Sequence, residues 1–190
     1  MAVNEPTFDA LNAGVAPGGL RSRGEIRLLI LYLLKTDSEP VTRKLIGDVM
    51  QERSIANYFE AMDAISELLD NGNITIEKGD EGQDLLVLTE RGRQAVSVVE
   101  EDLPKTVRET ALQTALRFQT LDRNQRENDV QIEPTEDGYQ VSFSMKDNDT
   151  MLMSLKMFAA DRDEAEKLKR NFLEDPVRVY SDILASLLMK

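Results

Sequence analysis

Residues 62–74 read Met62-Asp-Ala-Ile65-Ser-Glu-Leu68-Leu69-Asp-Asn-Gly72-Asn-Ile74, and the rest of the chain is organised around this stretch. Ile65, Leu68 and Leu69 fall at helical spacing, which predicts a helix with one buried face. Gly72 stands where the chain needs a residue of positive φ to leave the helix. The helix is therefore expected to end at about Asn71.

A two-stranded hairpin is predicted directly after this helix. The segment Ile74-Thr-Ile76-Glu-Lys78 alternates as a strand does, a Gly-Asp-Glu-Gly turn follows, and Leu85-Leu-Val-Leu88 gives the second strand. The hairpin leads into Leu88-Thr-Glu-Arg-Gly-Arg93, in which Thr89 is suited to cap a new helix.

Two more helices are predicted before the central one. Ser22 and Glu25 have the spacing of a capping box and start a helix that is apolar almost all round. Thr42 caps a second helix, and a third runs from about Asn57 to Asn71. Residues 1–19 show little apolar periodicity and are predicted to be a disordered tail.

The second half of the chain changes period. Pro104 suits the first turn of a long helix, so residues 103–128 are predicted as a connector helix. From Val130 onward apolar and polar residues alternate, which predicts a meander of three strands. Two helices finish the chain. The last predicted strand places four apolar residues on one face: Met151, Met153, Leu155 and Met157.

These elements define an α+β fold with a disordered tail and three structured parts. Residues 20–102 form a domain of helices and a hairpin, and residues 103–128 form the connector. Residues 129–190 form a small domain of a three-stranded antiparallel sheet with two helices.

Composition excludes several kinds of chemistry. The 190 residues include no cysteine and no histidine, so Ser-His and Cys-His triads and zinc sites with these ligands are absent. We therefore expect no enzyme, no cofactor and no metal site. Asp147 and Asp149 have the acids of a calcium loop but lack its glycine and distal glutamate, so a hairpin turn is the better interpretation. No apolar run is long enough to span a membrane, and no secretory signal is visible, so a cytoplasmic location is expected.

The net charge of −12 is distributed unevenly. Residues 20–53 contain seven Arg or Lys and five Asp or Glu, a net charge of +2. Residues 54–103 contain three Arg or Lys and twelve Asp or Glu, a net charge of −9. An acidic protein repels phosphate at long range. A nucleic-acid surface would therefore come mainly from the first segment.

The segment that ends with Leu88-Thr-Glu-Arg-Gly92 resembles the second half of a winged helix-turn-helix domain. It consists of a helix, a glycine that ends the helix, and a hairpin. Residues from Ile26 to about Val99 resemble bacterial transcriptional regulators of the PadR or MarR kind. The whole chain resembles an uncharacterised bacterial family in which a winged helix precedes a small α/β region. The resemblance implies that residues 20–102 are a winged helix domain and that the chain is a DNA-binding transcriptional regulator.

The candidate DNA-binding residues lie at four places in this domain. Arg43 and Lys44 start the second helix, where they can touch phosphates, and Asn57 and Tyr58 open the third, where they can reach bases and backbone. The remaining candidates are on or after the hairpin: Lys78, Arg91 and Arg93.

The third helix also carries Glu60, Asp63 and Glu67, which we interpret as a solvated acidic face. These acids oppose phosphate binding. They keep a second hypothesis open, in which the winged helix is a protein-protein interaction module whose acidic third helix docks a protein partner without DNA binding.

A homodimer is expected because two-fold operators mirror two-fold proteins. The C-terminal region is predicted to supply dimer contacts or to sense a ligand. The last helix provides the candidate dimer surface through a wide apolar stripe: Tyr180, Ile183, Leu184, Leu187 and Leu188.

Overall fold

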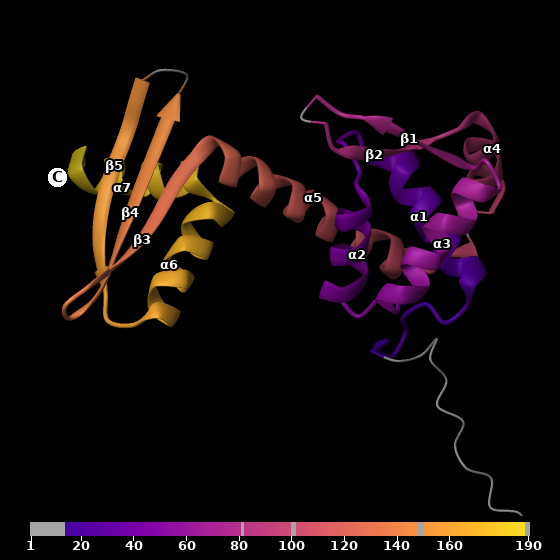
Figure 1. Ribbon diagram of the computed structural model, residues 1–190, viewed down its shortest axis with the longest axis horizontal. Helices are drawn as coiled ribbons and strands as arrows, with labels where there is room; N and C mark the ends of the chain where they lie inside the picture. Colours follow the sequence, from indigo (N-terminus) through magenta and orange to yellow (C-terminus); the bar gives the residue numbers. More distant parts are fainter. Residues whose placement is uncertain (1–13, 81, 100–101, 148–149, 189–190) are drawn as a thin grey trace, which may run out of the picture. The chain divides into compact units, whose positions relative to one another are not determined.

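The computed structural model describes residues 14–80, 82–99, 102–147 and 150–188 (Figure 1). The elements of this part run in the order α1 (Arg23–Thr36), α2 (Arg43–Glu52), α3 (Tyr58–Asp70), β1 (Ile74–Lys78), β2 (Asp84–Leu88), α4 (Glu90–Val99), α5 (Lys105–Glu127), β3 (Asn128–Thr135), β4 (Gly138–Asp147), β5 (Thr150–Ala159), α6 (Arg162–Glu174) and α7 (Pro176–Leu188). The predicted α+β class is confirmed. The chain divides into two compact units, Met1–Phe118 (unit 1) and Gln119–Lys190 (unit 2).

The helices of unit 1 begin at the predicted caps. Ser22 accepts a hydrogen bond from the Glu25 backbone N–H at 3.1 Å, and the Glu25 carboxylate accepts one from the Ser22 N–H at 3.2 Å. Thr42 Oγ1 accepts from the backbone N–H of Leu45 at 3.1 Å and caps α2. Each cap satisfies N–H groups that the first helical turn leaves without a partner.

The hairpin of unit 1 also forms as predicted. Gly72 has φ of +68° and ends α3, and β1 then pairs antiparallel with β2 from Ile74 opposite Leu88 to Lys78 opposite Asp84. Thr89 Oγ1 accepts from the Gly92 N–H at 3.1 Å and caps α4. A Cβ at Gly92 would lie 2.1 Å from the carbonyl oxygen of Asn73, so only glycine allows α4 to start this close to the hairpin.

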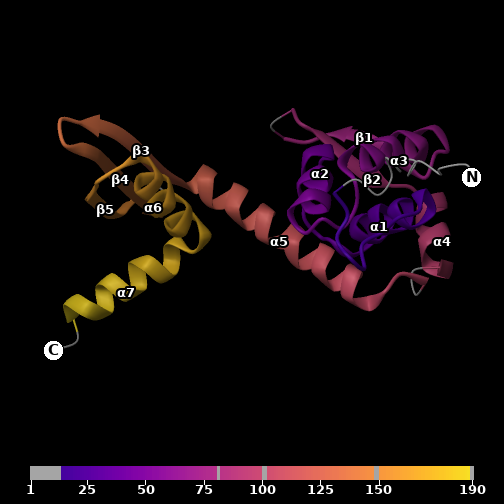
Figure 2. The same ribbon diagram turned by 90° about the horizontal axis from the view of Figure 1, so that it is seen from below.

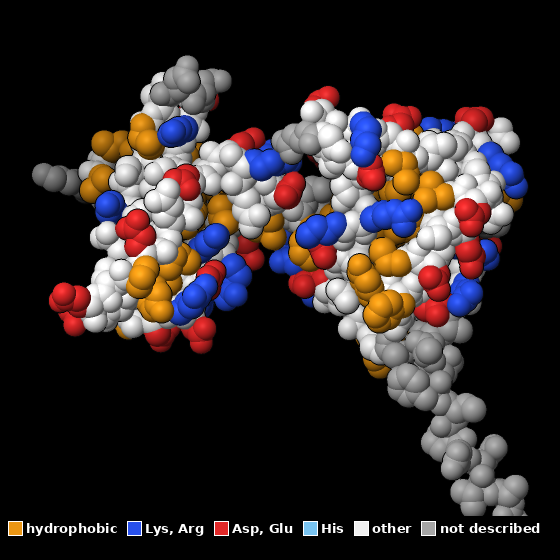
Figure 3. All heavy atoms as spheres, in the orientation of Figure 1, with side chains coloured by type: hydrophobic (Ala, Val, Ile, Leu, Met, Phe, Trp, Pro, Cys, Tyr) orange, Lys and Arg blue, Asp and Glu red, His pale blue; other side chains and the backbone are white. Residues whose placement is uncertain are grey.

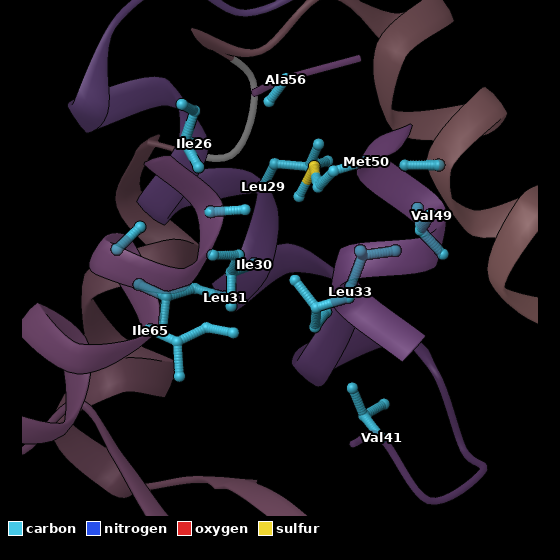
Figure 4. Close-up of a cluster of buried hydrophobic side chains, with 14 of the residues drawn as sticks. Ile26, Leu29, Ile30, Leu31, Leu33, Val41, Val49, Met50, Ala56 and Ile65 are labelled. Carbon is cyan, nitrogen blue, oxygen red and sulfur yellow. The ribbon is translucent and has the colours of Figure 1, made fainter. Parts of the chain in front are cut away.

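The core of unit 1 is centred on α1. Leu29 and Ile30 have no exposed surface and lie in a cluster with Val49 and Met50 of α2 and Ile65 of α3 (Figure 4). The same buried cluster includes residues of β1, β2, α4 and α5. Fully burying a side chain of this size stabilises a fold by roughly 1.5–3 kcal/mol. This single cluster therefore fixes the positions of α2, α3 and the hairpin.

Most of the predicted tail, residues 1–13, lies outside the described residues. Its last part is bound to unit 1. The N–H of Ala16 donates to the carbonyl of Ser54 at 2.9 Å, and that of Leu20 donates to Ile55 at 2.7 Å. Residues 14–19 therefore run along the connection between α2 and α3.

Unit 2 is built on an antiparallel sheet with the order β3-β4-β5. Val141 and Phe143 of β4 are buried beneath α6, where the rings of Phe143 and Phe172 lie 5.0 Å apart between centroids. The predicted alternation of apolar and polar residues thus corresponds to a sheet whose apolar face is covered by α6. The last turns of α5 lead into β3, and the Asn124 side chain donates to the carbonyl oxygen of Leu173 at 2.8 Å.

The strand β5 contains an irregularity that the sequence pattern did not predict. Met153 lies opposite Met145, but Met151 lies opposite Lys146, so Leu152 is an extra residue in the ladder. A bulge of this kind shifts the side chains that precede it to the other face. The prediction that Met151 shares a face with Met153, Leu155 and Met157 is therefore wrong, since Met151 lies on the face of Lys146. The turn predicted at residues 146–149 includes residues 148 and 149, which lie outside the described residues.

The last helix, α7, makes few contacts in its own unit. Only Pro176 among its residues is buried, whereas Leu187 and Leu188 are 76% and 77% exposed. Figure 2 shows α7 leading away from α6, with its C-terminal end standing clear of the sheet.

Candidate functional site

The start of α3 presents two aromatic side chains to the outside. Asn57 caps the helix, and its Oδ1 accepts from the backbone N–H groups of Phe59 at 2.9 Å and Glu60 at 3.3 Å. The next side chains, Tyr58 and Phe59, are 37% and 74% exposed, and their rings meet edge to face with centroids 5.6 Å apart. The cap therefore fixes a short aromatic pair at the helix N-terminus.

Helical geometry explains why Phe59 points outward. The buried stripe of α3 consists of Ala61, Ala64, Ile65 and Leu68, and Phe59 falls outside this spacing. Tyr58 leans toward α2, because a Cβ added to Gly47 would lie 2.6 Å from the Tyr58 ring. Phe59 was missed as a site residue, although its place off the apolar stripe could have marked it.

Two of the three acids predicted to form the acidic face of α3 are held by α1. The Arg23 guanidinium contacts the Glu60 carboxylate at 3.0 Å, and Glu60 has a side chain only 11% exposed. Glu67 pairs with Arg27 at 2.7 Å and with Arg23 at 3.6 Å. The predicted solvated acidic face is therefore wrong for Glu60 and Glu67, which lie at the border with α1. Asp63 alone of these three acids is exposed.

The cations predicted on α2 differ in their surroundings. Lys44 is exposed and hydrogen bonded to Asp48 one turn later. Arg43 is half-buried, and no ion pair joins it to any residue in the described ranges. The first turn of α2 lies beside the hairpin, since Thr42 forms a β-bridge with Leu85.

The structure does not bring all the predicted DNA-binding residues together. Lys78 is at the far end of β1, bonded to Asp84, near the start of α2. Arg91 and Arg93 follow the opposite end of the hairpin, next to the C-terminal end of α3, and Arg93 lies 3.7 Å from Glu90. The N-terminal ends of α2 and α3 carry the other four candidates. Arg91 and Arg93 are thus separated from Asn57 and Tyr58 by the length of α3, about 20 Å at 1.5 Å per residue.

The surface over α2 and α3 is mixed in character. Figure 3 shows orange hydrophobic side chains on this face of unit 1, with blue and red side chains at their borders. Exposed hydrophobic groups of this region include Tyr58, Phe59 and Ile76. A surface of this composition suits a contact in which apolar groups as well as charges take part.

The predicted dimer residues all lie on α7. Tyr180, Ile183 and Leu184 are half-buried, and Leu187 and Leu188 are exposed. They recur at intervals of three and four residues and form one apolar stripe. The chain leaves the last part of this stripe, Leu187 and Leu188, exposed, and exposed apolar groups that adjoin one another are typical of an interaction surface.

One hollow of the structure lies beside a single helix. A hollow in unit 2 is lined by residues of α6 and its N-cap, among them Asp161, Glu164 and Arg170. A hollow on one helix does not enclose a ligand as binding pockets do. In the described ranges, no three His, Cys, Asp or Glu side chains are grouped to hold a metal ion. Within the same ranges, no helix has the length and apolarity that crossing a membrane requires.

The molecule is thus an α+β protein in which a unit of helices and a hairpin is joined to a small sheet unit. Residues 26–187 match the family described as a domain of unknown function (DUF4364), and the chain belongs to this family. No curated protein and no solved structure matches the chain.

Proposed function

We propose that the chain is a dimeric, winged-helix, DNA-binding transcriptional regulator. The observation that carries this proposal is the start of α3, where Tyr58 and Phe59 are exposed beside the Asn57 cap while Glu60 and Glu67 are paired with arginines of α1. The proposal assigns the chain no catalytic role, and it places the protein in the cytoplasm, where bacterial DNA is.

The order of elements supports a winged helix. Three helices pack around one core, and an antiparallel hairpin follows the third helix directly. In helix-turn-helix proteins the last helix enters the major groove with its N-terminal residues on base edges. The Oδ1 of Asn57 is already used as the helix cap, so the exposed ring of Phe59, which suits the thymine methyl group, is the better candidate for a base contact.

The electrostatics of α3 are less unfavourable than its sequence suggests. Arg23 and Arg27 balance Glu60 and Glu67, so Asp63 is the main acid left near the aromatic pair. Lys44 and Lys78 are bonded to acids at the surface, and exposed ion pairs contribute only about 0–1 kcal/mol. Phosphate groups can therefore compete for both lysines.

The dimer is proposed to form through unit 2. A single unit from a chain of net charge −12 would bind DNA weakly, whereas two units read both halves of a two-fold operator. The exposed stripe on α7 supports a role in dimerisation, and the open hollow on α6 gives less support to ligand sensing.

The first test is capture of fragmented genomic DNA from the source organism at low and physiological salt. The wild-type chain should enrich a few sequences with two-fold symmetry. Arg43→Ala with Lys44→Ala should reduce capture and lower the salt slope of binding by about 2.

The matched control is Lys167→Ala with Arg170→Ala, which removes the same two charges from α6. If the control reduces capture as much as the α2 variant, α2 is not the DNA surface. If the wild type enriches nothing even at low salt, the regulator proposal is wrong.

The α7 contact is tested separately by light scattering. Leu187→Ser with Leu188→Ser should shift the full chain from dimer to monomer, because both exposed side chains belong to the proposed seam. A chain truncated after Glu174 that stays dimeric would exclude α7 as the dimer surface.

A protein-interaction module is the second candidate function. The observation that favours it is the exposed aromatic pair, since Tyr and Phe are enriched at the centres of protein interfaces. The two functions differ in salt response. A protein partner held by Phe59 should resist salt and be lost with Phe59→Ala, whereas DNA binding should weaken steeply as salt rises.

A further inference from the structure

The two edges of the sheet in unit 2 differ in how they are protected from pairing with another strand. The β3 edge carries Asp129, Glu133 and Pro134, all of which oppose the addition of a strand. The β5 edge has one charge, Lys156, and no proline. An edge with this composition is a template for pairing unless something covers it.

The bulge at Leu152 limits the regular part of this edge to Met153–Ala159. Within it, Met157 and Phe158 are exposed large hydrophobic residues, and Ser154 and Lys156 are exposed as well. The edge therefore offers about seven residues of ordered backbone with apolar side chains, enough for a short interchain ladder.

We infer that β5 pairs antiparallel with β5 of a second copy of the chain, with Leu155 opposite its own copy at the two-fold axis. A two-fold axis perpendicular to the sheet places the faces covered by α6 in the two copies on the same side of the joined sheet. Odd-numbered residues of one β5 must therefore lie opposite odd-numbered residues of the other, and even-numbered residues opposite even-numbered ones. Centring the pair on Leu155 places Met153 opposite Met157 and Ser154 opposite Lys156. Centring it on Lys156 would oppose two like charges, which is destabilising.

Self-complementarity favours a second copy over an unrelated strand. In the inferred register, apolar residues face apolar residues on the covered side, and each lysine faces a serine on the open side.

This inference deepens the dimer part of the proposed function, on which it rests, and is independent of DNA binding. It assigns the two-fold contact to a continuous six-stranded sheet rather than to α7 alone.

The test measures the dimer dissociation constant of the full chain by sedimentation, without DNA. Ser154→Glu places a carboxylate opposite Lys156 of the second copy and should tighten the dimer. Ser154→Lys places two like charges opposite each other and should weaken it. Each change occurs twice per dimer, so a shift of about 2-fold to 30-fold is expected in each direction.

The matched controls are Ser142→Glu and Ser142→Lys. Ser142 lies opposite the same Lys156 within its own chain, on the central strand β4, where it cannot face a second copy. These variants should leave the dissociation constant within about 2-fold of wild type. Circular dichroism confirms that every variant keeps its secondary structure.

The register is tested independently with Leu155→Cys. The chain has no cysteine, so a disulfide-linked dimer can form only through the new thiol. Residues opposite each other in an antiparallel ladder have Cα atoms about 4.5–5.5 Å apart, within disulfide range. Leu155→Cys should cross-link under oxidation, and Ser142→Cys should not.

Opposite shifts for the Ser154 pair together with selective cross-linking would support β5 pairing, even if the protein captures no DNA. A monomer at all concentrations, or equal behaviour of the Ser154 and Ser142 variants, would overturn it. So would a dimer that responds only to changes at Leu187 and Leu188.

Discussion

The two units bury their apolar residues to very different extents. In unit 1 five of the eight apolar residues of α1 are buried and the other three are half-buried. The buried cluster of this unit draws on four other helices and both strands of the hairpin. In unit 2 the buried cluster consists of Val141, Phe143, Ala159, Ala165, Phe172 and Leu173. Met151, Met157 and Phe158 of the same sheet are exposed. Both units thus leave apolar residues at the surface, but unit 1 has a large buried core and unit 2 a small one.

The helices α1 and α7 show the difference most clearly. Both are rich in leucine and isoleucine, so composition alone assigns them similar roles. Leu29 of α1 has no exposed surface, whereas Leu187 of α7 is 76% exposed. An apolar helix can therefore be assigned to a core or to an interface only when its neighbours in the fold are known.

The largest expected effect comes from exchanging a leucine for alanine in each helix. Leu29→Ala removes a fully buried side chain and should lower the free energy of unfolding of unit 1 by about 2–5 kcal/mol. Leu187→Ala should change the stability of the monomer by less than about 0.5 kcal/mol, because its side chain is already in water. Hydrogen exchange under increasing urea measures the two units separately. Equal losses from the two variants would contradict the comparison.

The N-cap of α3 provides a prediction of intermediate size. Asn57→Ala removes the acceptor for the N–H groups of Phe59 and Glu60 and should destabilise unit 1 by about 0.5–2 kcal/mol. Asn57→Asp keeps an acceptor at the same place and is the control. Denaturant unfolding measures both. A loss as large for aspartate as for alanine would mean that the cap does not hold the aromatic pair in place.

Local features of the fold could be predicted from the sequence because their causes are local. The capping box at Ser22, the positive φ at Gly72 and the cap at Thr89 each depend on a few neighbouring residues, and all three are present. The direction of Glu60 and Glu67 could not be predicted. Periodicity identifies the buried stripe of α3 but not the helix that borders it, and the partners Arg23 and Arg27 are about 40 residues away.

The same limit applies to unit 2 and to the candidate site. Alternation predicted β5, but the bulge at Leu152 depends on how β4 and β5 are joined and paired, so the face of Met151 was assigned wrongly. At the site, residue type identified Asn57 and Tyr58. Phe59 became visible as a site residue only when the buried stripe of α3 was known.

The smallest expected effect on stability concerns the ion pair of Arg27 with Glu67. Both side chains are about one-third exposed, so Arg27→Ala should cost no more than about 1 kcal/mol, and a double-mutant cycle with Glu67→Ala should give a coupling of about 0.2–1 kcal/mol. The effect of Arg27→Ala on DNA binding should be easier to detect than its effect on stability. The substitution removes the positive charge that lies closest to the Glu67 carboxylate on α3. Under the regulator proposal, Arg27→Ala should weaken DNA binding, and the added change Glu67→Gln should restore it although neither residue is at the start of α3. Fluorescence anisotropy on a captured operator measures both effects. If Glu67→Gln does not reverse the weaker DNA binding of Arg27→Ala, Arg27 itself contacts DNA. The ion pairs between α1 and α3 would then not explain why α3 can bind DNA despite its acids.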